Sequence, residues 1–445
     1  MQEVRFIDLF AGIGGLRLGF EDAFKEAGIS TKCVMTSEIK PYALKVLHQN
    51  FQHDNFVGDI TKVQNSEIPD FDFLLGGFPC QPFSASGKRQ GFTDTRGTLF
   101  FEIERILSEK RPFGFILENV EGLVKHDMVN KHDDVGRTLK TIIDKLELLD
   151  YHVSWNVLNA QDFGLPQTRK RVFIVGTLCE KISLKNFEVL HKKIESVLDK
   201  GLPVMNTKFT ELLFKHFSID ELYGKSIKDK RGGGNNIHSW EIGIKGEITE
   251  EQSIILDKLF KERRKKKWAV EHGIKWMDGM PLTLDQIRTF HDSPNLKLLL
   301  DDLVTKGYLK FEHPKSLIKE ETLLGVKTFR VENKKLRPGY NIVSGKLSFE
   351  INKILDPNDV APTLVATDMA RLVVPDNNGL RRMSLREGLR LFGYPEWFEI
   401  NTNPTEGFDL LGNTVAVPVV KAVAQRLANV YYKTYITSST PVCSE

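Results

Sequence analysis

The sequence is poor in cysteine and has no long uncharged apolar run. Its four cysteines, Cys33, Cys80, Cys179 and Cys443, lie far apart and form no C-x-x-C pair, which argues against a disulfide framework and against a zinc site. No stretch reaches about 18 uncharged apolar residues, and the opening MQEVRFIDLF lacks the zones of a signal peptide. These absences predict a cytoplasmic protein with no membrane span and no metal.

Internal repeats and low-complexity tracts are also missing. The 445 residues are 41% apolar and 27% charged, as in a globular protein of two or three domains. The net charge is only +3, but residues 181–350 hold 32 basic and 24 acidic residues, whereas the remainder holds 30 and 35. A basic middle indicates either a surface that faces a polyanion or a lysine-rich solvated surface, and charge alone does not choose between them.

Residues 1–180 alternate short apolar runs with helix-like segments. The expected strands are Val4–Phe10, Lys32–Glu38, Phe71–Gly76, Gly114–Glu118, His152–Asn159 and Arg171–Thr177. The expected helices between them are Gly15–Ala27, Pro41–Phe51, Leu99–Lys110 and Asp134–Leu149. This alternation predicts a parallel sheet with helices on both faces, in which ligands bind beyond the carboxyl ends of the strands.

The alternation stops near residue 181 and returns near residue 360. Between them, helical patterns at Lys208–Phe217 and Thr249–Glu271 flank a turn, RGGGNN, and residues 282–312 indicate a helix followed by a strand. The latter fits either a winged helix-turn-helix or, as we favour, ordinary α+β packing. Residues 361–374 resemble strands, and helices are expected at Ser384–Phe392 and Val417–Tyr432. We therefore expect a first part (1–180), an insert (181–359), a return segment (360–435) and a flexible tail (436–445).

Two segments indicate a cofactor and a nucleophile. In DLFAGIGGLRLGF a strand ends in a glycine turn, and the acids Glu38 and Asp59 follow later strands, which favours an adenosine-containing cofactor. In GGFPCQPFS, Cys80 follows a strand and enters a small, polar loop. A thiol titrates at about 8.5, so its activation needs positive charge, for which Arg169 and Arg171 in QTRKRVF are candidates. The alternative for Cys80 is a structural cysteine in a turn.

A third segment is ENV, residues 118–120, at the end of a very apolar strand. An acid at the end of a buried strand has a raised pKa because it is desolvated, which suits a group that donates a proton at neutral pH. Helix capping by Glu118 or Asn119 is the alternative.

These segments, in this order, resemble the cytosine-5 DNA methyltransferases, in particular the type II restriction–modification methylases. RGTLFFEI (96–103), RRMSLREGLRLFGYP (381–395) and GNTVAVPVV (412–420) extend the likeness, which covers residues 1–180 and about 360–435. The resemblance implies an α/β fold, a Rossmann-like S-adenosylmethionine-dependent catalytic domain with an inserted, smaller α+β target-recognition domain. It also implies base flipping, because a cytosine inside a duplex is out of reach.

The resemblance assigns roles to individual residues. Cys80 would add to carbon 6 of cytosine, Glu118 would stabilise the protonated ring nitrogen, and Arg171, with Arg169, would contact the base carbonyl and phosphate. The residues placed around S-adenosylmethionine are Phe10, Gly12, Gly14, Glu38, Ile39, Asp59, Ile60, Pro79, Leu99, Asn413 and Val415. The expected DNA contacts are Gln81, Ser84, Ser86 and Arg96, together with Arg231, Arg263, Arg264 and Lys265 of the insert.

The expected partner is double-stranded DNA, bound by a monomer in the cytoplasm of a bacterium or phage host, and the functional partner is a cognate restriction endonuclease. A solitary regulatory methylase and a transfer-RNA cytosine-5 methyltransferase are the alternatives of the same chemistry. A DNA-binding regulator with an inactive core is the alternative of another class, and the intact Cys80, Glu118 and Arg171 argue against it.

Overall fold

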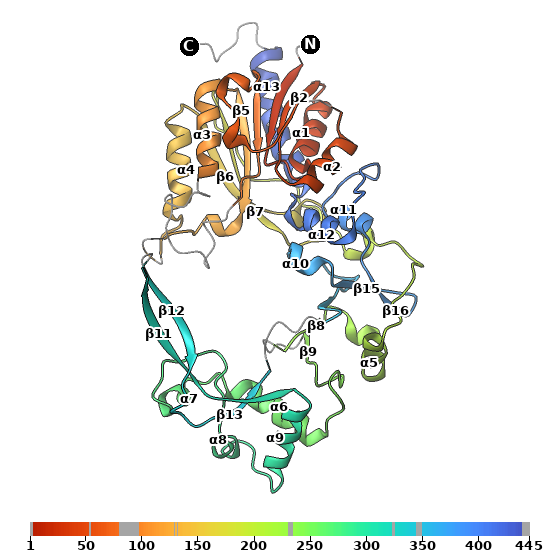
Figure 1. Ribbon diagram of the computed structural model, residues 1–445. Coiled ribbons are helices and arrows are strands. Elements are labelled where there is room, and N and C mark those ends of the chain that lie inside the picture. Colours follow the sequence, from red (N-terminus) through yellow and green to blue (C-terminus); the bar gives the residue numbers. More distant parts are fainter. Residues whose placement is uncertain are drawn as a thin grey trace. The chain divides into compact units, whose positions relative to one another are not determined.

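The structure is a computed structural model that describes residues 3–52, 55–79, 98–128, 130, 132–229, 235–322, 325–343 and 349–437. It contains two compact units (Figure 1). The first comprises residues 1–200, 356–370 and 383–445, and the second comprises residues 201–355 and 371–382.

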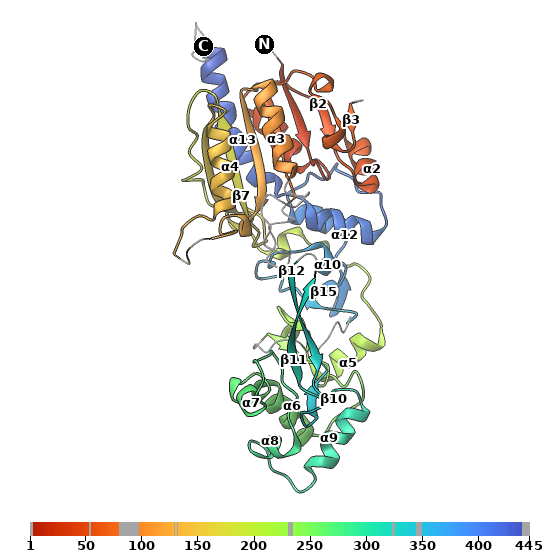
Figure 2. The ribbon, with the colours of Figure 1, turned by 60° about the vertical axis from the view of Figure 1, so that its left-hand side comes forward.

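A mixed sheet forms the centre of the first unit (Figure 2). Its strands are β1 (Val4–Leu9), β2 (Thr31–Ser37), β3 (Phe56–Val57), β4 (Phe73–Gly76), β5 (Gly114–Val120), β6 (His152–Asn159) and β7 (Lys170–Thr177), in the order β3-β2-β1-β4-β5-β7-β6. The expected strands are all present, but the sheet is not wholly parallel, because β7 runs antiparallel to both β5 and β6. The short connection between β6 and β7 contains no crossover helix, which a parallel pair would need.

Helices cover both faces of this sheet. The helices of the first unit are α1 (Gly15–Glu26), α2 (Pro41–Asn50), α3 (Thr98–Lys110), α4 (Arg137–Glu147), α10 (Ala366–Met369), α11 (Leu385–Leu391), α12 (Pro404–Asn413) and α13 (Val417–Tyr432). Residues of α1 and α13 form one core with Val4 and Phe6 of β1, whereas residues of α3 and α4 form a second core with Ile7 and Leu9. Because successive side chains of β1 point to opposite faces of the sheet, this strand contributes to both cores.

The return segment is part of the first unit because α13 packs directly against α1. The two helices approach so closely that a Cβ at Gly19 would lie 2.6 Å from Cβ of Val420. The segment Pro404–Tyr435 is long and apolar enough to cross a membrane by composition, but two thirds of its most apolar 18-residue window is buried in the fold, as in a core helix.

The boundaries between the units differ from the expected ones. Ile182 and Leu184 belong to the core beneath α13, and the N–H of Asp199 donates to Glu387 (2.8 Å), so the first unit extends to residue 200 rather than 180. Residues 371–382 belong to the second unit, and the expected strands at 361–374 are in fact helix α10 followed by β15. Residues 438–445 of the expected tail lie outside the described residues.

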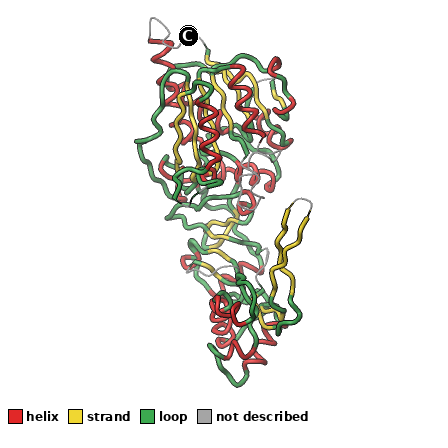
Figure 3. The backbone as a smooth tube through the Cα atoms, turned by 90° about the vertical axis from the view of Figure 1, so that its left-hand side faces the viewer, coloured by secondary structure: helices red, strands yellow, loops and turns green. Residues whose placement is uncertain are grey.

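The second unit has a small sheet, a helical cluster and a two-stranded ribbon (Figure 3). The sheet has the order β16-β15-β14-β8-β9. The strands are β8 (Ser226–Ile227), β9 (Asn236–Ile237), β10 (Leu309–Glu312), β11 (Lys315–Thr322), β12 (Gly325–Glu332), β13 (Gly339–Ile342), β14 (Lys353–Ile354), β15 (Leu372–Asp376) and β16 (Gly379–Arg382). The helices are α5 (Lys208–His216), α6 (Glu250–Glu262), α7 (Lys266–Glu271), α8 (Leu284–Arg288) and α9 (Leu296–Thr305).

The two cysteines in the described part of the chain, Cys33 and Cys179, differ in state. Cys33 is a free, buried thiol, as expected of a small hydrophobic side chain, but Cys179 is disulfide-bonded.

Candidate active site

The glycine turn after β1 is held by the carboxylate of Glu38. Phe10 and Gly12 both have positive φ (57° and 58°), a conformation that is costly for phenylalanine and marks a constrained turn. Glu38 Oε2 accepts from the N–H of Gly12, and Oε1 accepts from the N–H groups of Ile39 and Lys40, each at 2.8 Å. The sheet therefore presents an ordered carboxylate at the carboxyl ends of β1 and β2.

A cavity of about 1040 Å³ lies at this end of the sheet. Nine of the eleven expected cofactor residues line it: Phe10, Gly12, Glu38, Ile39, Asp59, Ile60, Pro79, Leu99 and Asn413. The other two, Gly14 and Val415, pack against neighbouring residues. A Cβ on Gly14 would lie 2.4 Å from the ring of Phe51, and Val415 is buried in the core beneath α1 and α13.

The donor set of the cavity fits S-adenosylmethionine. Glu38 lies at the end of β2, where a carboxylate can accept from ribose hydroxyls, and Asp59 begins the next turn, where its Oδ1 accepts from Thr61 N (3.1 Å) and Oγ1 (2.8 Å). The side chains of Ile39, Ile60 and Leu99 give this carboxylate-rich wall apolar surfaces on which an adenine ring can lie.

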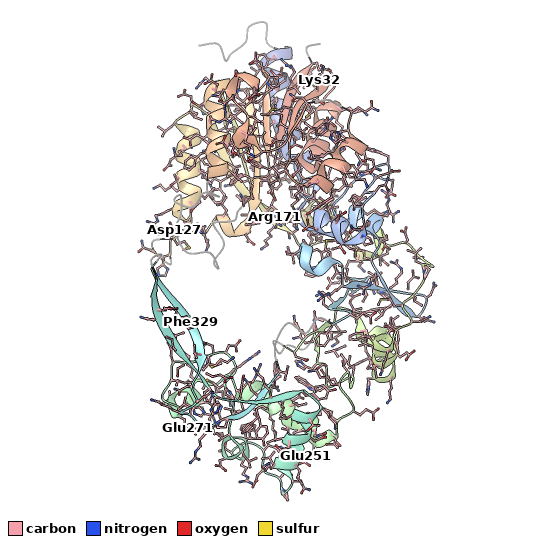
Figure 4. The ribbon with its side chains drawn as sticks, viewed as in Figure 1. Lys32, Asp127, Arg171, Glu251, Glu271 and Phe329 are labelled. Carbon is pink, nitrogen blue, oxygen red and sulfur yellow. The ribbon has the colours of Figure 1, made fainter. Side chains whose placement is uncertain are left out.

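Glu118 and Arg171 form the polar centre of the opposite wall. Glu118, at the end of β5, and Arg171, at the start of β7, join through Oε1 and Nε at 3.1 Å, and both line the cavity. Burial raises the pKa of the Glu118 carboxyl, and the positive charges of Arg171 and Arg169 lower it in part. Figure 4 shows Arg171 and Asp127 at the same end of the sheet, away from Lys32 at the start of β2. The site therefore holds a carboxyl whose environment favours the protonated form.

Asn119 anchors the segment that leads into Cys80. Its Nδ2 donates to the carbonyl of Phe78 (2.9 Å), while its Oδ1 accepts from the N–H of Val120 (2.8 Å). The expected nucleophile Cys80 itself, with Gln81, Ser84, Ser86 and Arg96, lies outside the described residues. The structure thus ties the start of this loop to the strand that carries Glu118, a contact that the sequence alone did not reveal.

Arg169 lines the cavity and is also bound to the return segment. Its guanidinium is buried, lies 5.1 Å from the ring of Phe392 and donates to the carbonyls of Leu364 (3.2 Å), Gly412 (3.2 Å) and Thr414 (2.6 Å). Burial lowers its pKa to about 9. These bonds fix the return segment on either side of Asn413, so Arg169 positions this segment, while its contact with the base stays a prediction.

Five residues after ENV also line the cavity but were not expected there: Gly122, Lys125, His126, Asp127 and Met128. His126 Nδ1 lies 2.7 Å from Thr138 Oγ1, and burial lowers the pKa of its imidazole. Asp127 has a positive φ (58°) and forms an ion pair with Arg137 at 2.8 Å. The sequence offered one indication of their role, namely their position shortly after β5, the strand that carries Glu118.

The two arginines of the basic run in the insert make internal contacts. Arg263 is 3% exposed and donates to Asn341 Oδ1 (2.8 Å), which excludes it as a DNA contact. Arg264 lies 4.7 Å from the Phe260 ring and pairs with Asp278 at 3.2 Å, and Lys265 pairs with Glu262 but remains exposed. The expected contact Arg231 lies outside the described residues.

Asp409 of α12 connects two walls of the cavity. Its Oδ2 accepts from Lys40 Nζ (2.9 Å) and Tyr42 Oη (2.6 Å), and its Oδ1 lies 3.2 Å from Asn413 Nδ2. Lys40 and Asn413 line the cavity. These cationic and hydroxyl donors hold the pKa of Asp409 below its ordinary value. Asp409 thus joins the segment after Glu38 to the return segment.

Replacement of Asp409 should therefore weaken cofactor binding. We expect Asp409→Ala to raise the Kd for S-adenosylmethionine about fivefold, because two hydrogen bonds and a half-exposed ion pair together contribute about 1 kcal/mol to the order of the cavity. Isothermal titration measures this Kd. The matched control is Asp70→Ala, which breaks a remote ion pair with Lys110 (3.1 Å) and should leave the Kd unchanged. Equal affinities of Asp409→Ala and wild type would contradict the role.

The chain belongs to the C-5 cytosine-specific DNA methylase family, whose model matches residues 4–429. It is 57% identical to the type II methyltransferase M.NlaIV of Neisseria lactamica over 96% of this chain and 99% of that protein. It is 55% identical to M.NgoBV of Neisseria gonorrhoeae, with the same coverage, and 41% identical to M.BanI of Aneurinibacillus aneurinilyticus over 96% of each. The protein is therefore a DNA (cytosine-5-)-methyltransferase.

Solved structures agree on the fold. The Entamoeba histolytica methyltransferase EhMeth superposes with a TM-score of 0.51 at 15% identity, over 97% of this chain and 99% of that chain. The S. pombe Dnmt2 methyltransferase has a TM-score of 0.50 at 15% identity, over 97% and 100%. At such identities the likeness concerns the Rossmann-like methyltransferase fold and not the substrate.

Proposed function

We propose that the protein methylates carbon 5 of a flipped cytosine in a specific sequence of double-stranded DNA through a covalent adduct with Cys80. The observation that carries this proposal is the pairing of Glu118 with Arg171 on the wall of the cavity, next to Asn119, which holds the segment leading into Cys80. A flipped base is needed because the thiolate and the methyl donor approach the ring from opposite faces.

In the proposed reaction the Cys80 thiolate forms a bond to carbon 6 of cytosine. Glu118, whose pKa is raised by burial, donates a proton to the ring nitrogen between the carbonyl and amino carbons and so stabilises the negative charge that develops there. Carbon 5 becomes nucleophilic and forms a bond to the methyl carbon, while the bond from that carbon to the sulfur of the methyl donor breaks. A water molecule then takes the carbon 5 proton, the electrons of that bond form the ring double bond and expel the Cys80 thiolate, and the ring nitrogen returns its proton to Glu118. Arg171 keeps Glu118 in place and donates to the base carbonyl.

S-adenosylmethionine, when bound, supplies an electrophilic methyl group on a sulfonium. Glu38 would hold its ribose and Asp59 its adenine amino group, while the turn at Phe10 and Gly12 would accommodate the amino acid portion. Pro79, Leu99 and Asn413 would complete the walls and exclude water. Val415 supports this site from the core.

The biological role that we propose is the modification half of a type II restriction–modification system. Its support is the high identity to curated type II methyltransferases along nearly the whole chain. In this role the protein acts as a monomer on DNA in the cytoplasm, where it associates with the nucleoid, and protects the DNA from a cognate restriction endonuclease. The first unit is the catalytic domain and the basic second unit is the target-recognition domain.

A Cys80→Ser variant tests the covalent step. It should methylate duplex DNA at least about a thousandfold more slowly than wild type, because a hydroxyl is a far weaker nucleophile than a thiolate at neutral pH, while it still binds the target duplex. Transfer of tritium from labelled cofactor to DNA measures the rate, and Cys33→Ser serves as the matched control. Wild-type activity of Cys80→Ser would refute the assignment.

The substrate needs a separate experiment. Bisulfite sequencing of DNA from cells that express the chain should show methylated cytosines in one sequence context. The same tritium assay with transfer RNA should give no transfer, and transfer to RNA alone would favour the transfer-RNA methyltransferase instead.

A further inference from the structure

The ribbon formed by β11 and β12 lacks a second layer for much of its length. The strands pair antiparallel from Lys315 with Glu332 to Thr322 with Gly325. Figures 1 and 3 show them extending away from the helices of their own unit. Eight residues per strand span about 27 Å. An isolated two-stranded ribbon is at best marginally stable in water, so its base must be anchored and its outer part is available for a partner.

The base of the ribbon is indeed clamped. Arg330 donates to the carbonyl of Trp276 (2.8 Å) and reaches the carbonyl of Lys315 (3.4 Å). Asn333 Nδ2 donates to Ser316 Oγ at 2.9 Å. These bonds fix the direction in which the ribbon extends, so its outer residues are presented to a partner with little loss of conformational entropy on binding.

One face of the ribbon carries three exposed apolar side chains. Ile318 and Phe329 are cross-strand partners, and Val331, two residues along β12, lies on the same face. Their exposed fractions are 42%, 38% and 41%. Phe329 is labelled on β12 in Figure 4. Exposed apolar side chains that gather on one face of a protruding element indicate a binding surface rather than scattered surface residues.

The excess of basic residues around this face favours a polyanionic partner. Residues 315–337 contain seven basic and three acidic residues, and the second unit as a whole contains 31 basic and 22 acidic residues. Lys319 and Thr328 lie on the opposite face of the ribbon, and Lys334, Lys335 and Arg337 follow its base. Such a distribution suits phosphates along the rims of a groove, with the apolar pair between them.

We propose that the β11–β12 ribbon enters the major groove of the target duplex and that Ile318 and Phe329 contact base edges there. The major groove is about 12 Å wide and admits a two-stranded ribbon, and apolar side chains can contact thymine methyl groups within it. The inference rests on the proposed function, because it takes the methylated DNA as the partner. It adds the ribbon to the DNA contacts that the sequence predicts for the insert.

Photo-crosslinking tests the contact without depending on a destabilising substitution. Phe329→p-benzoylphenylalanine should crosslink to the duplex that carries the methylated sequence, at major-groove positions. Leu298→p-benzoylphenylalanine is the matched control, because Leu298 is exposed (70%) on α9 of the same unit, and it should not crosslink. A crosslink from residue 329 only to protein, or to the minor groove, would overturn the proposal.

A double variant tests its energetic importance. Ile318→Thr/Phe329→Thr keeps β-forming residues in both strands and should raise the Kd for the target duplex about tenfold, with little change for a duplex that lacks the target sequence. The double variant should have the same Kd for S-adenosylmethionine and the same melting temperature as the control variant Leu298→Thr. Unchanged target affinity would refute the role of the ribbon alone, whereas a wild-type protein that methylates no DNA would refute the proposed function.

Discussion

Glu118→Gln is expected to lower the rate of methyl transfer about a thousandfold. Glutamine keeps the size of the side chain and can donate a hydrogen bond, but it has no proton to give to the ring nitrogen. General acid catalysis contributes about 10² to 10⁴ in rate, and here the charge on the ring would otherwise stay uncompensated in a buried site. Single-turnover tritium transfer with saturating cofactor and duplex separates this effect from binding.

The same substitution should change the pH profile. The pKa of Glu118 is raised because burial disfavours its charged form, so the carboxyl stays protonated to higher pH than an exposed glutamate. Wild-type activity should fall as the pH rises through this pKa, since the ionised form cannot donate. Glu118→Gln has no such group and should lack this decline.

A neighbouring glutamate provides the control. Glu121 lies three residues further along, is exposed, and forms only a long ion pair with Lys170 (3.9 Å). Glu121→Gln should therefore keep wild-type activity and pH dependence. If Glu118→Gln stayed within threefold of wild type, Glu118 would not be the proton donor. If it lost cofactor binding as well, its role would be structural.

The parts of the site that the sequence predicted are those determined locally. A strand that ends in glycines with positive φ must turn at the sheet edge, and Glu38 at the end of the next parallel strand must then lie beside that turn. The 2.8 Å bond between Gly12 N and Glu38 is the direct result. Asp59 and Ile60 follow in the same way from the third strand.

The parts that the sequence did not predict depend on partners far along the chain. Arg169 and Arg171 are two residues apart with the same chemistry, yet one pairs with Glu118 while the other bonds to carbonyls more than 190 residues away. Arg263 belongs to a run of basic residues that suggests a solvated surface, but it reaches inward to Asn341. Composition describes such residues by type, and only the fold determines which partner each one meets.

Asp8→Asn is expected to make the protein more stable at and above neutral pH. Asp8, on β1 next to the glycine turn, is fully buried, and neither of its carboxylate oxygens has a hydrogen-bond partner among the described residues. Burial raises its pKa to about 8, and the charges of Glu21 and Glu38 add to this rise, against the opposing effect of Arg17. A neutral amide of the same shape avoids the cost of a buried charge.

The direction in which the unfolding free energy changes with pH follows from the number of protons that each state binds. Between the unfolded pKa of 3.8 and the folded pKa of about 8, the folded state holds a proton on Asp8 that the unfolded state has lost, so the unfolding free energy falls as the pH rises. The slope is about 1.4 kcal/mol per pH unit, which gives a loss of up to about 4 kcal/mol at pH 7. Below the unfolded pKa the loss vanishes, and above the folded pKa it becomes constant.

Urea denaturation of wild type and Asp8→Asn between pH 5 and pH 9 measures the difference directly, because contributions from all other groups cancel between the two proteins. The gap in unfolding free energy should widen as the pH rises to about 8 and then stay level. Asp22→Asn, an exposed change on α1, should give no gap at any pH. Parallel curves for Asp8→Asn and wild type would mean that the carboxyl is ionised and solvated in the folded protein. A widening gap would mean that the buried acid next to the glycine turn is neutral in the folded protein up to a pH of about 8.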